Sequence, residues 1–319
     1  MITSDTEQLA SNIIHTNELR ACILKTLLYF DIFYYPLNMQ EIKDNCQQLH
    51  ITLAETETIL NELITNGLLK KQDDFYFVND DSSIVNRRKA GNKLANEALH
   101  IASRYSNLIS KFPFVRGVYL SGSLSKGYMD KDSDIDYFII TAPSRLWLCR
   151  TLLVTFKKIV LLNSRKYFCV NYFIDTTNME IPDKNLFTAT ELVSMHPTYN
   201  YKLYKQCMAE NLWVKEFYPN KKVKEDLNVL PEKKFFFKHT LEKILNSNLG
   251  EKLDEWCFRI TIKHWQKKFK NFDKNQFDLH LRSRKNVSKH HPQGFQTKAL
   301  NAHQQKIKDF ESKYNIVLS

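Results

Sequence analysis

The stretch Gly117–Thr141, GVYLSGSLSKGYMDKDSDIDYFIIT, constrains the fold of this chain more than any other segment. It joins an apolar strand, Val115–Leu120, to a turn of small residues and then to a second strand that opens with Asp134 and Asp136. Because side chains alternate between the faces of a strand, both carboxylates are expected on one face, with Ile135 on the other. The pattern therefore predicts a strand-turn-strand unit with a carboxylate pair beside the turn.

Each part of this unit has a chemical use. Two carboxylates on one face suit Mg²⁺, which keeps most of its waters and prefers one or two carboxylates together with substrate phosphates. Gly122 and Ser123 follow the first strand and are expected to lead into a helix, whose free N–H groups and dipole attract a phosphate. The residues thus predict a site for a metal ion and a phosphorylated ligand.

The order of these residues resembles the DNA polymerase β-type nucleotidyltransferase superfamily. The resemblance rests on Gly122-Ser123, then Gly127, then Ser-Asp-Ile-Asp entering a strand. It implies transfer of a nucleoside monophosphate from an NTP to an acceptor, with pyrophosphate released. By the same resemblance, Gly122, Ser123 and Lys126 would hold the triphosphate, and Asp134 and Asp136 would bind Mg²⁺ or Mn²⁺. The NTP base and the acceptor, whether small molecule, protein or nucleic acid, stay open.

The third carboxylate of that family is where this sequence departs from the pattern. A crossover helix over Arg145–Leu162 should precede a strand over Lys166–Asp175, on which the family carries the third acid. Asn171 stands there with apolar neighbours on both sides, and Asp175 is the alternative, about 13 Å further along the strand. An Asn binds metal through its carbonyl oxygen but cannot act as a base. We therefore expect Asn171 to bind metal more weakly than an acid would and to contribute to catalysis only by coordination.

The segment before this core resembles a winged helix-turn-helix. Residues 1–17 are polar and expected to be loosely held, and residues 18–80 read as three helices and a hairpin that turns at Asp73-Asp74. The helix Glu55–Asn66, which a DNA reader would place in the major groove, carries acidic residues and no Arg or Lys. We therefore favour an accessory or protein-contact module over a DNA-binding one.

The fold class expected is α+β: a nucleotidyltransferase-type mixed sheet with helices over residues 87–180, between the winged-helix-like module and a basic helical domain over residues 181–319. Arg87, Arg88 and Lys89 are interpreted as a solvated helix start, and Thr188 with Glu191 as a capping box. The net charge of +11 arises wholly within 233–319, which holds 19 Lys/Arg against 8 Asp/Glu. Its cluster of cations either reaches a polyanion or forms a solvated loop. The cluster comprises Arg282, Arg284, Lys285 and Lys289.

The cellular setting is expected to be the cytoplasm, without a membrane span. The first residues lack the basic and apolar regions of a signal peptide, and Arg150, Lys157 and Lys158 interrupt the most apolar long segment. The six cysteines are scattered singly and are interpreted as buried, reduced thiols.

Three functions are consistent with these residues. The first is an active metal-dependent nucleotidyltransferase. The second, suggested by Asn171, is a catalytically weakened nucleotide-binding regulator that uses the winged-helix-like module to contact a partner. The third is a nucleic-acid-binding protein that uses the basic C-terminal part.

Overall fold

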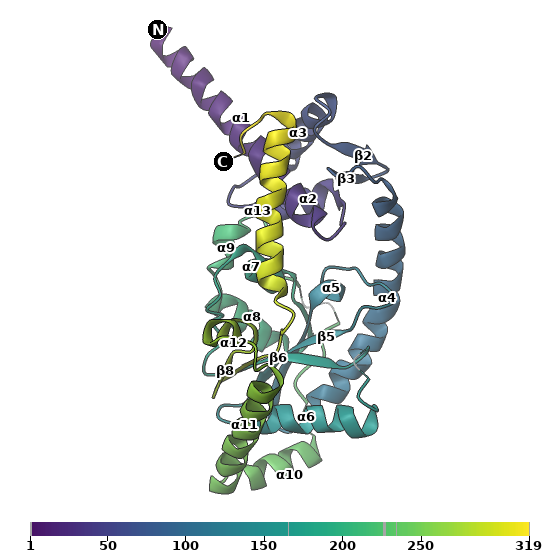
Figure 1. The fold of residues 1–319 in the computed structure, drawn as a ribbon, viewed down its shortest axis with the longest axis vertical. Helices are drawn as coiled ribbons and strands as arrows, with labels where there is room; N and C mark the ends of the chain where they lie inside the picture. The colour runs from purple at the N-terminus through teal and green to yellow at the C-terminus, as the bar shows by residue number, and fades with distance from the viewer. Residues whose placement is uncertain (1, 165, 226–227, 234, 319) are drawn as a thin grey trace.

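A computed structural model describes residues 2–164, 166–225, 228–233 and 235–318, with the backbone alone for 2–13. Two β-sheets organise the fold, a three-stranded sheet near the N-terminus and a six-stranded sheet in the middle of the molecule (Figure 1). The long helix α4 (Ser83–Ser110) connects them. The residues expected to bind phosphate and metal all belong to the larger sheet or to the turn beside it.

The larger sheet is mixed, with the strand order β7-β4-β5-β6-β9-β8. Strands β5 and β6 are parallel because the crossover helix α6 (Leu146–Val160) connects them, and the remaining neighbours are antiparallel. The expected α+β sheet is therefore present. Its strands are β4 (Val115–Ser121), β5 (Asp136–Thr141), β6 (Cys169–Asp175), β7 (His196–Tyr199), β8 (Ser283–Arg284) and β9 (Val287–Lys289).

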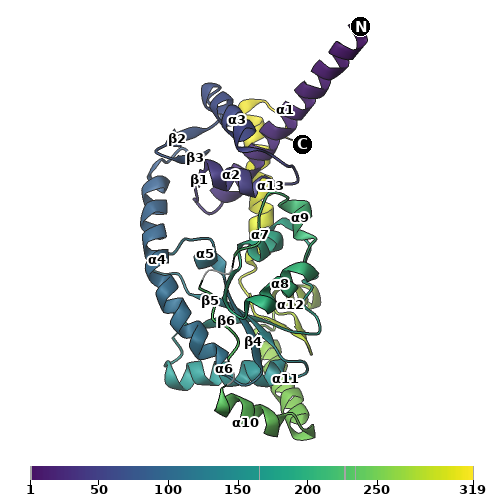
Figure 2. The ribbon, with the colours of Figure 1, turned by 180° about the vertical axis from the view of Figure 1, so that it is seen from behind.

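Both faces of this sheet are covered, so its strands are apolar on both sides. One face packs against α4, α6 and α11, through side chains such as Val118, Ile139 and Trp265. The other packs against α7 and α8, through Tyr119, Phe138 and Tyr172 among others (Figure 2). Further helices along the chain are α5 (Gly122–Ser125), α7 (Leu186–Ser194), α8 (Tyr201–Glu210), α9 (Val214–Phe217), α10 (Phe236–Leu245), α11 (Asn248–Lys268), α12 (Lys274–His280) and α13 (Phe295–Tyr314).

The N-terminal unit contains the expected helices and hairpin. Asn38 caps α2 in a capping box with Glu41, and the hairpin turns at Asp73-Asp74, where Asp73 has a φ of 54°. A short strand adds to the hairpin and completes the smaller sheet, in the order β1-β3-β2. Its elements are α1 (Ile2–Asp31), β1 (Leu37–Asn38), α2 (Met39–Asn45), α3 (Leu53–Thr65), β2 (Lys70–Gln72) and β3 (Phe75–Phe77).

Three features differ from the sequence-based expectation. Helix α1 begins at Ile2, although residues 1–17 were expected to be loosely held. The 181–319 part is not purely helical, because its strands β7 and β9 extend the central sheet at β4 and β6. Arg88 is buried rather than solvated, because its guanidinium lies over the Tyr35 ring and donates to the Pro36 carbonyl.

The C-terminal helix α13 runs back along the molecule and packs against the later part of α1, whose first turns project beyond this contact (Figure 1). His303 of α13 contacts the Lys25 carbonyl of α1 at 3.1 Å, and Lys306 pairs with the buried Asp31. One hydrophobic core extends from α1–α3 through α7 and α13 to the sheet. The N-terminal unit is thus packed directly on the larger sheet through this core.

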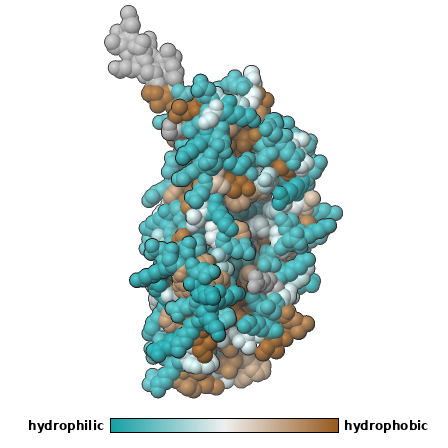
Figure 3. All heavy atoms as spheres, in the orientation of Figure 1, coloured by the Kyte–Doolittle hydropathy of each residue, from teal (hydrophilic) through white to brown (hydrophobic). Residues whose placement is uncertain are grey.

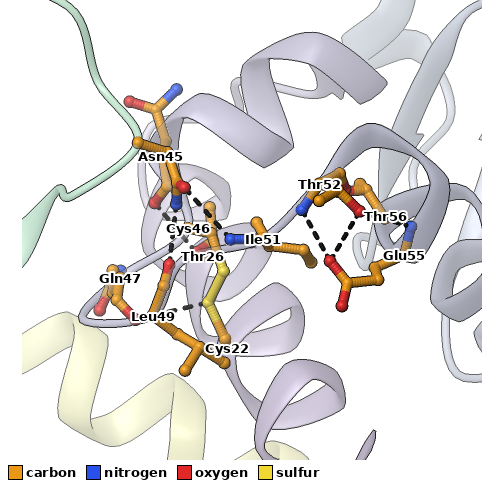
Figure 4. Close-up of a disulfide and its surroundings, with 11 residues drawn as sticks. Cys22, Thr26, Asn45, Cys46, Gln47, Leu49, Ile51, Thr52, Glu55 and Thr56 are labelled. Atoms are coloured by element: carbon orange, nitrogen blue, oxygen red, sulfur yellow. Dashed lines mark hydrogen bonds between the residues drawn. A yellow bond between two sulfur atoms is a disulfide. The ribbon is translucent and has the colours of Figure 1, made fainter.

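A disulfide joins Cys22 of α1 to Cys46, the residue that follows α2 (Figure 4). Helices α1 and α2 pack side by side, which brings the two Cα atoms to 5.8 Å, within the range that a disulfide requires. The prediction of six reduced thiols is therefore wrong for this pair, and the expected cytoplasmic location loses one of its supports. The remaining four cysteines are free.

The surface is mostly hydrophilic, with apolar side chains gathered at the end furthest from the N-terminus (Figure 3). This apolar end includes Phe236 and Phe237 of α10 and Leu162 after α6, each about four-fifths exposed or more. Among the residues with described structure, none of the helices combines the length and apolar character that a bilayer span requires.

Candidate functional site

The site is built where β4 ends beside the start of β5. Ser121 of β4 is opposite Asp136 of β5 in the antiparallel register, so the turn that follows Ser121 lies directly against the Asp136 carboxylate. Gly122 has a φ of +65°, and a Cβ there would lie 2.6 Å from Asp136 Oδ2. Both the left-handed backbone and the close approach require glycine at this position.

The two aspartates take the alternating arrangement that the sequence predicts. Ile135 and Tyr137 are fully buried, whereas Asp134 and Asp136 are partly exposed. The ladder of β5 begins at Asp136 rather than at Asp134, but Ile135 already exchanges backbone hydrogen bonds with the chain leading into β6. Asp134 therefore lies just before the strand, and its side chain is on the same face as that of Asp136, as expected.

Burial raises the pKa of Asp136 to about 6. The carboxylates of Asp134 and Glu191 act in the same direction, whereas the Cys169 thiol and the Lys126 ammonium lower it. The raised pKa means that the nearby positive charge does not compensate the ionised carboxylate for its burial and for the neighbouring carboxylates. The residues around Asp136 would therefore gain from a bound cation.

Asn171 lies beside this carboxylate, as its place on β6 predicts. Its amide nitrogen donates to Asp136 Oδ1 at 2.8 Å, and its amide oxygen is buried and has no hydrogen-bond partner among the described residues. An unpaired buried oxygen next to a carboxylate is a donor atom of the kind that Mg²⁺ takes. Asn171 and the two aspartates fit a hard cation, although the described part of the chain has no group of three His, Cys, Asp or Glu side chains that could hold one.

Asp175, the other candidate for the third acid, lies at the far end of β6. In the parallel register it is paired with Thr141, at the opposite end of β5 from Asp136. Its Oδ1 accepts hydrogen bonds from the Thr177 backbone and hydroxyl, at 2.9 and 2.5 Å. It is thus a turn residue at the strand end, outside the group around Asp136.

The turn after β4 differs from the expected helix start, because α5 is only one turn long and offers no long helix dipole. Ser123 is the second residue of α5, and its carbonyl accepts from the Lys126 and Tyr128 amides at 3.0 and 3.2 Å. Lys126 folds back over the turn and donates to the Gly122 carbonyl at 3.0 Å. The Lys126 ammonium therefore lies against the Gly122 backbone and is near enough to Asp136 to act on the pKa of that carboxyl.

Glu191 of α7 is the residue at this site that sequence reasoning missed. Its Oε2 accepts from the Gly122 amide at 3.2 Å and its Oε1 accepts from Lys126 Nζ at 2.7 Å. The predicted capping box of Thr188 and Glu191 is wrong, because Asn185 is the residue that caps α7. No local pattern marks Glu191, since its partners precede it by 65 residues or more.

Two further lysines lie near the turn. Lys224 Nζ donates to the Ser125 carbonyl at 2.8 Å, and Lys221 Nζ donates to Asn45 Oδ1 at 3.0 Å. Burial lowers the pKa of Lys224 to about 7, and the ammonium groups of Lys221 and Lys126 act in the same direction. Three converging ammonium groups repel one another, and an anion at the turn would relieve that repulsion.

The C-terminal basic cluster is ion-paired. Asp183 accepts from both Arg282 and Lys289, at 2.8 and 3.0 Å, and Asp278 accepts from Arg284. Lys285 lies 4.0 Å from Glu255. Because carboxylates offset these cations, they add little to a surface for a polyanion.

Comparison with known families agrees with this geometry. The family model described as "Nucleotidyltransferase domain" matches residues 106–190, which include β4, α5, β5, α6, β6 and the first five of the nine residues of α7. A search of curated proteins and a search of solved structures each gave no match. Residues 106–190 of this chain are therefore similar to a nucleotidyltransferase domain, which is consistent with the resemblance to the DNA polymerase β-type superfamily.

Proposed function

We propose that this protein transfers a nucleoside monophosphate from an NTP to an acceptor hydroxyl or other nucleophile, with release of pyrophosphate. The observation that carries the proposal is the contact between the Gly122 turn and Asp136, where a Cβ would meet the carboxylate at 2.6 Å. A phosphate held by the turn would therefore lie against the carboxylate pair. Such a site performs phosphoryl chemistry mainly by positioning and charge neutralisation.

The site residues would divide this work. The Gly122 amide, Ser123 and Lys126 would bind the polyphosphate tail, and Asp134 and Asp136, together with the Asn171 amide oxygen, would hold Mg²⁺ or Mn²⁺. The bound metal would neutralise charge on the phosphates and lower the pKa of the acceptor. The acceptor atom attacks the α-phosphorus in line, the bond from that phosphorus to the bridging oxygen breaks, and the acceptor proton passes to solvent or to the acceptor's own base.

Asn171 limits which acceptors this site can use. An amide can orient Asp136 and bind a cation, but it cannot take a proton at neutral pH. We therefore expect an acceptor that is already a good nucleophile or that brings its own base.

Incubation of the full chain with each α-labelled NTP and Mg²⁺ or Mn²⁺ tests the proposal. Label should move to an acceptor, or pyrophosphate should be released, at a rate that falls at least about a hundredfold in Asp134→Ala. Exposed Asp74 offers the matched control Asp74→Ala, which should keep full activity. An absence of turnover with all four NTPs and a broad set of acceptors would refute it.

A second function is favoured by one observation that links the turn to the N-terminal unit. The Tyr35 hydroxyl of the N-terminal unit donates to the Lys126 carbonyl at 2.6 Å, so the phosphate turn is bonded to the winged-helix-like part. In this alternative, nucleotide binding at the turn changes how that part contacts a partner, and no transfer occurs. It predicts NTP binding without turnover, so rapid turnover by the wild-type protein would eliminate it.

A nucleic-acid-binding role has less support. Asp183, Asp278 and Glu255 offset the cluster of cations within the basic C-terminal part, although residues 233–319 as a whole carry a net charge of +11.

A further inference from the structure

Glu191 uses both of its carboxylate oxygens on the two groups that the proposed function gives to phosphate. The Gly122 amide donates to one oxygen at 3.2 Å and the Lys126 ammonium donates to the other at 2.7 Å. These donors are the kind that phosphate oxygens accept from, because a charged acceptor forms the stronger hydrogen bonds with amides and ammonium groups. A carboxylate therefore stands where the polyphosphate would bind.

The surroundings of Glu191 explain why this contact can open. On one side are Asp136 and Asp134, and the Glu191 charge is close enough to Asp136 to contribute to its raised pKa. On the other side is Lys126. The ammonium groups of Lys126 and Lys221 are both near enough to Lys224 to lower its pKa. The Glu191 side chain is 29% exposed, so it has room to leave toward solvent.

We propose that Glu191 is an intramolecular competitor for the polyphosphate site: its carboxylate occupies the anion position in the free protein and must be displaced before a nucleotide tail binds. This inference rests on the proposed function, because it takes the Gly122 turn as the polyphosphate site. For every ligand that needs those donors, the apparent dissociation constant is the intrinsic one divided by the fraction of molecules in which the site is open. Glu191 therefore lowers the affinity for all such ligands by one common factor.

The competitor has two consequences for turnover. Because the factor is the same for every ligand, an anion that binds the open site weakly, such as orthophosphate, then needs a much higher concentration to occupy it, whereas a tail with several phosphate groups starts from a higher affinity. When pyrophosphate leaves after transfer, Glu191 returns to the same donors and opposes rebinding of the product. The residue would therefore set both the affinity threshold for the nucleotide and the ease of product release.

The experiment measures binding of inorganic pyrophosphate and inorganic tripolyphosphate to the full chain by calorimetry, with Mg²⁺ present and no NTP. The variant is Glu191→Gln, which keeps the size of the side chain and removes its charge. The matched control is Glu210→Gln on α8, where an exposed carboxylate accepts from Gln206 at the surface. We expect E191Q to lower both dissociation constants by about tenfold and by the same factor, and E210Q to leave them unchanged, since a charged hydrogen bond is involved.

The inference is overturned if E191Q leaves either dissociation constant unchanged or raises it, or if neither anion binds the wild-type chain. If E191Q does not fold with the wild-type melting temperature, Glu191→Asp replaces it, because the shorter side chain withdraws the carboxylate from its donors and should also tighten both ligands. Failure of the proposed function is seen separately, as absent NTP turnover with intact polyphosphate binding.

Discussion

Asp136 is the side chain at which stability and function oppose each other most clearly. Its carboxylate is partly buried, and burial raises its pKa to about 6. The unfolded chain loses this proton near pH 4, so between about pH 4 and 6 the folded state holds a proton that the unfolded state has released. The buried charge therefore lowers the free energy of unfolding fully above pH 6, and it has no such effect below pH 4, where the group is protonated in both states.

Replacing Asp136 by Asn should stabilise the metal-free protein and abolish transfer. The raised pKa corresponds to a gain of about 1–3 kcal/mol in the free energy of unfolding above pH 6, with a smaller gain at pH 5. Urea denaturation at pH 5 and pH 8 measures both values. If the variant is less stable than wild type at pH 8, the contacts of the ionised Asp136 carboxylate stabilise the fold by more than its burial destabilises it.

Asn171 is the residue whose replacement should strengthen the metal site. Asn171→Asp would place a second carboxylate against Asp136 Oδ1, now 2.8 Å from the Asn171 nitrogen. Without metal the like charges should lower the melting temperature, and with Mg²⁺ the melting temperature should rise more than in wild type, with a Mg²⁺ dissociation constant lower by about tenfold. Thermal shift over a Mg²⁺ titration measures this.

The control for Asn171 is Asp175→Asn, which removes the other candidate acid. Asp175 bonds to the turn at Thr177, so its loss should lower stability while leaving the response to Mg²⁺ unchanged. A weaker Mg²⁺ response in D175N would move the third ligand to that end of β6.

At the scale of elements, the turn between β4 and β5 holds two glycines that make a matched pair. Both have positive φ, +65° at Gly122 and +74° at Gly127, but an added Cβ meets Asp136 only at Gly122 and meets nothing within 4 Å at Gly127. Each Gly→Ala change should cost about 1–2 kcal/mol for the left-handed backbone. Gly122→Ala should in addition displace Asp136 and lower kcat/KM by more than about tenfold. Equal kinetic losses in both variants would show that the Asp136 contact is unimportant.

This turn also shows how far sequence reasoning reaches. The order of Gly122, Ser123, Asp134 and Asp136 predicts the sheet, the turn and the carboxylate pair, because each depends on residues close together in the chain and on the alternation of a strand. Glu191 could not be found in that way. It fits a helix start by local pattern, and only the packing of α7 on the sheet brings it to Gly122.

The same distinction accounts for the other differences. The burial of Arg88 depends on Tyr35 and Pro36, more than fifty residues before it. The pairing of Cys22 with Cys46 follows from the contact of α1 with α2, which scattered cysteines do not reveal. Strands β8 and β9 have two and three residues and carry no alternating pattern to predict them, so they became visible only as partners of β6.

At the scale of the whole molecule, the N-terminal unit is joined to the site through a small number of specific bonds. Tyr35→Phe removes the donor to the Lys126 carbonyl, a bond of 2.6 Å in a partly buried place. We expect a loss of about 1 kcal/mol of stability and a dissociation constant for Mg²⁺–NTP raised a few-fold, because the turn loses its support. The adjacent Tyr34 is 52% exposed, so Tyr34→Phe is the control and should bind nucleotide as wild type does. If wild type, Tyr35→Phe and Tyr34→Phe bind Mg²⁺–NTP with the same affinity, the N-terminal unit does not influence nucleotide binding at the site.

The most direct test of the central claim is a crystal structure of the protein with Mg²⁺ and a non-hydrolysable NTP analogue. We expect phosphate oxygens within hydrogen-bond distance of the Gly122 amide and Lys126 Nζ, and a metal ion held by Asp134 and Asp136 against the same phosphates. A nucleotide bound elsewhere, with Asp136 remote from its phosphates, would contradict the account.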